Sequence, residues 1–312
     1  MLFEFYYQRR AKIFYLFLAI SILLSSLMFF SQVTLIQSNL INFEIHLEEA
    51  TKNKEDIHQL LGGNFSGSFN NNVEQIDNPL KYYYLAYQSS LVAMNVKNGI
   101  NQLLSSSYFI IFPFIAGIYG IVAANSDIKY HATKIRLSLD AQWKLNLNKI
   151  LASFLSIFFF LLASIGVFLL LQYLSIFFIK PEPSLNIDGT LLNQISYLNK
   201  APVQLLLIII VALMNFIVCF YLTVVTRNTF FSIFLLGIYN LILPPLGKYD
   251  LKNILLTIYP SIFNTNASTF RANVGQNIEL GFHLIIISFF LLLAYILLME
   301  YIQRKWSIPS EK

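Results

Sequence analysis

Charged side chains are missing from six long apolar segments of this chain. These segments are residues 13–36, 103–124, 150–179, 203–225, 229–246 and 282–299, and none of them contains Asp, Glu, Lys or Arg. At 1.5 Å per residue, a helix of each length crosses or nearly crosses a hydrocarbon core of roughly 30 Å. The sequence therefore predicts six transmembrane helices.

The same absence argues against transport driven by an ion gradient. Transporters of that kind carry a carboxylate, a histidine or a paired charge inside the membrane, where the coupling ion or proton binds. The one candidate is His283, at the start of the last apolar segment. An interfacial position explains it better than a proton relay does. Any energy for uphill transport must therefore enter from outside this chain.

Cysteine and catalytic motifs are scarce as well. Cys219 is the only cysteine, so no disulfide can form within the chain. His46, His58, His131 and His283 are scattered and no HExxH motif occurs, which argues against an intramembrane metalloprotease. A serine protease of the rhomboid kind would have only His283 as its base. We therefore expect no enzymatic activity and no cofactor or metal bound by this chain.

The residues that are present define the class. Hydrophobic residues make up 56% of the 312 and charged residues 12%, with a mean hydropathy of +0.62, which predicts an all-α integral membrane protein. With both termini in the cytoplasm, the cytoplasmic segments hold 12 Lys and Arg in 53 residues, against 9 in 124 outside. The positive-inside rule favours this orientation. No basic stripe with interleaved aromatic residues occurs, so we expect no nucleic-acid partner.

Two segments outside the predicted spans have their own character. Residues 1–12 combine apolar and aromatic residues with Arg9, Arg10 and Lys12, which favours a short helix in the inner interface over a frayed basic tail. Residues 37–102 form the extracellular segment and are expected to be helical, with a break at Gly62-Gly63-Asn64.

The cytoplasmic region 125–149 is amphipathic. Ile128, Ala132, Ile135 and Leu139 recur at helical spacing, and Trp143 and Leu147 follow at i, i+4. Two short helices that turn near residues 138–140 would project an apolar ridge into the cytoplasm. An interfacial hairpin lying on lipid fits the same periodicity equally well.

A family resemblance bears on this region. Asp127, then Ala132-Thr133, Leu137-Ser138-Leu139 and Lys149-Ile150-Leu151-Ala152, resembles the acidic, Gly-Thr, Leu-Leu-Ser and Gly-Lys-x-Leu-Ala pattern of type-2 ATP-binding-cassette (ABC) exporter permeases. The chain departs from that pattern at Ala132, where Gly is usual, at Asp140, where Pro is common, and at Asn148, where Gly often precedes the Lys.

The resemblance implies a complete architecture. Such permeases have an interfacial N-terminal helix, six spans, both ends inside, and a partly re-entrant helical segment between spans five and six. Residues 251–263, which end in Tyr259-Pro260-Ser261-Ile262-Phe263, are similar to that segment, although a plain external interfacial helix fits nearly as well. Independently, Pro244-Pro245 must end the fifth helix.

The resemblance also implies partners. The region 125–149 would dock on a cytoplasmic ABC ATPase subunit that binds ATP and Mg, and a second permease subunit, identical or related, would complete the pathway. The expected ATPase-coupling residues are Asp127, Ile135, Leu139, Asp140, Trp143 and Lys149. The chain is not the ATPase itself, because its only Gly-Lys pair, Gly247-Lys248, is followed by Tyr249 instead of Ser or Thr.

An uncharged pathway would suit a lipid, an amphipathic peptide or another hydrophobic compound. We expect its lining to include Ser21, Ser25, Asn215 and Thr223. The rival interpretation is a membrane sensor or immunity protein that binds a peptide or membrane partner through residues 37–102 without transporting it. The abundance of Ile, Asn, Lys and Phe is typical of a bacterium with A+T-rich DNA, so the bacterial cytoplasmic membrane and its lipids are the expected surroundings.

Overall fold

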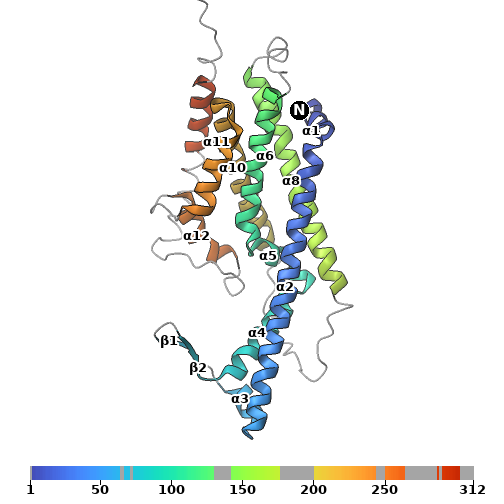
Figure 1. Cartoon of the computed structure of the whole chain (residues 1–312), viewed down its shortest axis with the longest axis vertical. Coiled ribbons are helices and arrows are strands. Elements are labelled where there is room, and N and C mark those ends of the chain that lie inside the picture. The colour runs from blue at the N-terminus through green and yellow to red at the C-terminus, as the bar shows by residue number, and fades with distance from the viewer. Residues whose placement is uncertain are drawn as a thin grey trace, which may run out of the picture. The chain divides into compact units, whose positions relative to one another are not determined.

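The structure is a computed structural model, and it describes residues 2–63, 67–70, 73–129, 142–175, 200–243, 250–263, 287 and 290–302. Nearly all elements in these ranges are helices (Figure 1). Four are long and apolar enough to cross a membrane: α2 (Ile13–Lys52), α6 (Tyr108–Lys129), α8 (Gln142–Ser175) and α10 (Ala201–Thr226). They support an all-α, multi-pass membrane protein.

The fifth and sixth predicted spans coincide with shorter apolar helices. The fifth comprises α11 (Thr229–Gly237) and the π-helix η3 (Ile238–Ile242), and the sixth is the helix Phe290–Ile302. The fifth ends just before Pro244-Pro245, as expected where a proline restricts the preceding residue. Residues 244–249 and the first residues of the predicted sixth span lie outside the described ranges, so six spans stay a prediction.

The first two spans have boundaries that differ from the prediction. The helix expected over 13–36 continues as α2 to Lys52. No Gly or Pro interrupts residues 37–52, and the packing of Phe43 and Ala50 against Leu80 stabilises this part of the helix. The segment expected over 103–124 is divided: α5 (Gly99–Leu104) ends before three serines, and α6 begins at Tyr108, whose N–H is 3.3 Å from Ser106 Oγ. The apolar runs were identified, but the positions of the helix ends were not.

By its contacts the chain divides into two units, and the second comprises residues 25–103 and 167–199. It contains residues 25–52 of α2, α3 (Ile57–Gly62), α4 (Pro79–Ala93), η1 (Val96–Asn98) and residues 99–103 of α5. Phe43, Ala50 and Leu80 form a small core, against which Tyr83, Tyr84 and several aliphatic residues pack.

This unit also holds an antiparallel hairpin of β1 (Gly67–Asn70) and β2 (Val73–Ile76), where the sequence predicted only helix and loop. Strands of four residues are too short to give a distinct alternating pattern.

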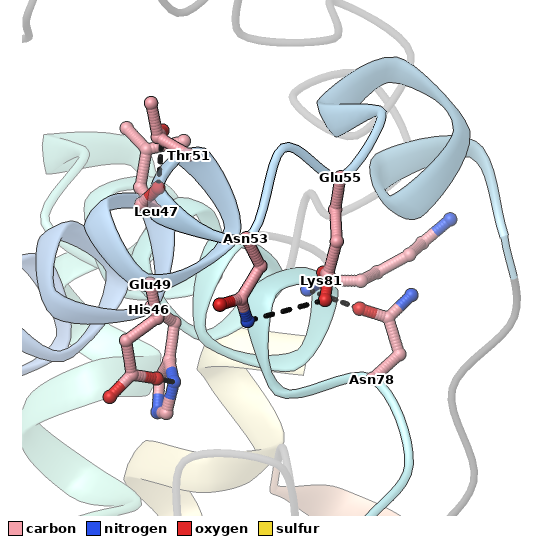
Figure 2. Close-up of polar contacts among 8 residues, drawn as sticks. All are labelled: His46, Leu47, Glu49, Thr51, Asn53, Glu55, Asn78 and Lys81. Carbon is pink, nitrogen blue, oxygen red and sulfur yellow. Dashed lines mark hydrogen bonds and ion pairs between the residues drawn. The ribbon is translucent and has the colours of Figure 1, made fainter.

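Polar contacts fix the chain between α2 and α4 (Figure 2). His46 Nδ1 lies 2.9 Å from Glu49 Oε2, and Asn53 Nδ2 donates to Glu55 Oε1 at 3.5 Å, where α2 ends. Asn78 accepts the Lys81 N–H at 3.2 Å as the N-cap of α4, and its Nδ2 donates to the Leu60 carbonyl at 2.7 Å. One side chain therefore starts α4 and ties it to α3.

The first unit comprises residues 1–24, 104–166 and 200–312, and α6 and α10 form its centre (Figure 1). Two glycines let these helices approach closely. A Cβ on Gly120 would lie 2.6 Å from the Phe216 carbonyl oxygen, and a Cβ on Gly117 would lie 3.2 Å from Cys219 Sγ. Such close backbone contact between apolar helices is typical of packing in membranes.

Two further helices belong to this unit, α1 (Leu2–Arg10) and α12 (Leu251–Ile262). The structure confirms a helix in each of the segments expected at 1–12 and 251–263. Tyr259 and Phe263 are buried, Tyr259 Oη donates to the Ser105 carbonyl, and Gln204 Nε2 donates to the Ile262 carbonyl at 3.0 Å. These contacts dock α12 on α10 and on the chain just before α6.

Candidate functional site

The first turns of α8 carry two faces of opposite character. One face is exposed and apolar: Trp143, Leu147, Leu151, Phe154 and Phe158 are each between 39% and 46% exposed. The other is buried and polar: Asn146, Lys149, Ser153 and Ser156 are each at most 7% exposed. Both sets recur at intervals of three and four residues, so each forms a stripe along the helix.

The buried face contacts α1 through Gln8, which is only 4% exposed. Gln8 Nε2 donates to Ser153 Oγ at 3.0 Å, and Tyr119 Oη donates to Gln8 Oε1 at 2.5 Å. Ser156 Oγ lies 3.3 Å from the same oxygen. A single amide thus joins α1, α6 and α8. Glu4, one turn earlier on α1, is buried as well.

Two further contacts fix the start of α8. Lys149 Nζ donates to the Ala123 carbonyl of α6 at 3.4 Å. Asn146 Nδ2 donates to Glu300 Oε1 at 2.9 Å, and the same oxygen accepts from Tyr221 Oη of α10 at 3.0 Å. The start of α8 is therefore bonded to α1, α6 and the helix Phe290–Ile302, and through Glu300 to α10.

The predicted coupling residues differ in exposure, and some of them lie outside the described residues. Trp143 is exposed, and Lys149 is buried in the bundle. Asp127 lies in the last turn of α6, and its side chain is outside the described set. Ile135, Leu139 and Asp140 lie outside the described residues, so their docking role stays a prediction.

Sequence reasoning missed Gln8, Asn146 and Glu300. Each adjoins an apolar run, and a polar residue at the end of such a run is expected to face water. The available signal was the spacing from Asn146 through Lys149 to Ser153, which places three polar groups on one helical face.

The predicted pathway residues occupy different surroundings. Ser21, Ser25 and Thr223 are fully buried, and Thr223 Oγ1 donates to the Cys219 carbonyl at 2.9 Å, within its own helix. Asn215 is half-buried and lines a cavity. A shared pathway for these residues remains a prediction.

Within the described ranges no group of three or more His, Cys, Asp or Glu side chains is placed to hold a metal ion. Comparisons with protein-family models, curated proteins and solved structures find no match to this chain.

Proposed function

We propose that this chain is the membrane-spanning permease subunit of an ABC exporter in a bacterial cytoplasmic membrane. The observation that carries the proposal is the two-faced start of α8, with Trp143 and Leu147 exposed on one side and Asn146 and Lys149 bonded into the bundle on the other. The resemblance of residues 127–152 to the coupling region of type-2 exporter permeases supports the same assignment.

The mechanism follows from this arrangement. An ATPase subunit that binds Trp143 and Leu147 applies force to α8, a continuous helix of 34 residues. Because Gln8 and Glu300 link that helix to its neighbours, the helices move together as a rigid body. Work done by nucleotide hydrolysis on the partner then reaches the spans without any charge moving through the hydrocarbon core.

The chain supplies no nucleotide site of its own, since Gly247-Lys248-Tyr249 lacks the P-loop pattern. ATP and Mg belong to the partner ATPase, and a second permease subunit completes the pathway. The uncharged apolar spans suit a lipid, an amphipathic peptide or another hydrophobic compound as cargo.

Fluorescence of Trp143 tests whether the exposed ridge faces a protein partner or lipid. The chain has two tryptophans, so Trp306→Phe leaves Trp143 as the only one. In lipid nanodiscs, we expect aqueous iodide to quench Trp143 and brominated phospholipids to leave it bright. Addition of an ABC ATPase subunit that co-purifies with this chain should then protect Trp143 from iodide.

The opposite quenching pattern would contradict the proposal. Strong quenching by brominated lipid, with no change when the ATPase is added, would identify residues 143–147 as part of a hairpin on the membrane surface. The control for protection by the ATPase is Tyr301→Trp in a chain without Trp143 and Trp306. Tyr301 is 67% exposed and is not part of the ridge.

A further inference from the structure

A cavity of about 200 Å³ lies within the first unit, where α6, α10, η3 and α12 meet. Its wall is mainly apolar, with Val211 and Leu255 among the contributors. The polar side chains on the wall are Asn215, Tyr239, Asn240 and Lys252. A mostly apolar cavity with a few convergent polar groups is the usual form of a small-molecule site.

The two asparagines are held in a defined orientation. Asn215 Nδ2 donates to the Val211 carbonyl at 3.1 Å, and Asn240 Nδ2 donates to the Leu236 carbonyl at 3.1 Å. Each amide therefore uses one of its two N–H donors on its own helix. Among the described residues, neither Oδ1 accepts a hydrogen bond, so both remain available as acceptors.

The backbone of α6 lacks one helical hydrogen bond beside the cavity. Pro113 lies inside α6 and has no N–H, so the usual helical bond from residue 113 to the Phe109 carbonyl cannot form. Both residues line the cavity. The wall also includes residues of the π-helical turn η3, and such turns occur frequently at functional sites. The cavity thus offers the two amide oxygens as acceptors and a second N–H on each amide as a donor, which suits an occupant with a hydroxyl group, because a hydroxyl both donates and accepts.

The charges near the cavity are already engaged. Lys252 Nζ donates to the carbonyls of Tyr239 and Leu243, the latter at 2.8 Å, and lies 4.7 Å from the centre of the Tyr239 ring. Tyr239 Oη donates to Asp250 Oδ1 at 2.8 Å. Burial lowers the pKa of the Lys252 ammonium, and the Asp250 carboxylate opposes that effect. A charged ligand would disturb these contacts, whereas a neutral one would not.

We propose that this cavity binds an uncharged amphiphile whose apolar body carries a hydroxyl group. The hydroxyl donates to Oδ1 of Asn215 or Asn240, and the apolar body lies against Val211 and Leu255. The volume fits, since an apolar cavity of about 150 Å³ holds benzene. This site is additional to the proposed transport function and does not depend on it.

Photolabelling of the purified full-length chain in nanodiscs tests the site. The probe is azi-octanol, a photoactivatable alcohol, and labelled positions are located by mass spectrometry. We expect labelling at residues 109–113 and 252–256, which octanol competes away. Octyl methyl ether, which cannot donate a hydrogen bond, and the anion octanoate should compete at least threefold more weakly than octanol.

Variants test the same contacts. Val211→Trp should fill the cavity and abolish labelling. Asn215→Leu should raise the octanol concentration needed for competition about threefold to tenfold, the effect of one neutral hydrogen bond. The matched control is Asn253→Leu, also an asparagine but on α12 and outside the cavity wall, which should leave competition unchanged.

Two results would overturn the proposal. One is labelling spread along exposed apolar helix faces and insensitive to Val211→Trp. The other is competition by octyl methyl ether that is as strong as competition by octanol. This measurement uses the parent chain alone, so it does not depend on the folding of any variant. Neither result affects the ATPase and Trp143 experiments, so failure here is distinguishable from failure of the transport proposal.

Discussion

Substitution of Gly120 by alanine tests the close packing of α6 against α10. The new Cβ would lie 2.6 Å from the Phe216 carbonyl oxygen and 3.2 Å from Phe216 Cδ2. Ordinary contacts begin near 3.4 Å, and the nearer obstacle is backbone, which no side-chain rotation can move aside. The two helices must therefore separate along this contact.

The magnitude follows from two opposing effects. Overpacking a close contact costs about 1–3 kcal/mol. Alanine in place of glycine within a helix recovers about 0.8–1 kcal/mol. Gly166 in α8 is the matched control, because a Cβ there meets nothing within 4 Å. Gly166→Ala should have the helical gain alone, so the two variants should differ by about 1–3 kcal/mol.

The assay is unfolding of each purified variant in the same detergent, followed by helical circular dichroism. We expect Gly166→Ala to be at least as stable as the parent protein and Gly120→Ala to be clearly less stable than Gly166→Ala. If Gly120→Ala is as stable as Gly166→Ala or more so, the close contact between α6 and α10 is wrong.

Three further substitutions test other contacts. Gln8→Leu leaves the buried Tyr119 hydroxyl without its acceptor, so unfolding in detergent should show a loss of about 1–3 kcal/mol. Glu300→Gln keeps an oxygen acceptor for Asn146 and Tyr221, so ATP hydrolysis by the purified complex should be unchanged. A large loss of hydrolysis would show that these two hydrogen bonds are not what Glu300 contributes. Asn78→Ala removes the N-cap of α4 and its hydrogen bond to the Leu60 carbonyl, so limited proteolysis should cut residues 37–102 faster than in the parent protein. ATP hydrolysis by the complex should be unchanged.

The sequence predicted the helical class well, because the absence of charge over about 20 residues is a strong signal for a membrane helix. It predicted the ends of helices less well. The extension of α2 to Lys52 depends on the packing of Phe43 and Ala50 against Leu80, which is a contact between distant segments. Hydropathy carries no information on such contacts.

The polar side of the candidate site was harder to predict. Gln8 and Ser153 lie 145 residues apart in the sequence, and a single chain gives no sign that they meet. The exposed side was easier, since the spacing of Trp143 and Leu147 predicts one helical face. Their shared exposure agrees with that prediction.

We propose that this chain works with a nucleotide-hydrolysing partner through Trp143 and Leu147. The most direct measurement is vanadate-sensitive Mg-ATPase activity in complexes purified through a tag on the full chain from its native membranes, with Trp143→Glu/Leu147→Glu prepared in parallel. We expect activity with the parent chain, loss with the double variant, and retention with Tyr301→Glu, because Tyr301 is also exposed but lies away from the ridge. Equal activity in all three preparations, or none in the parent, would contradict the account.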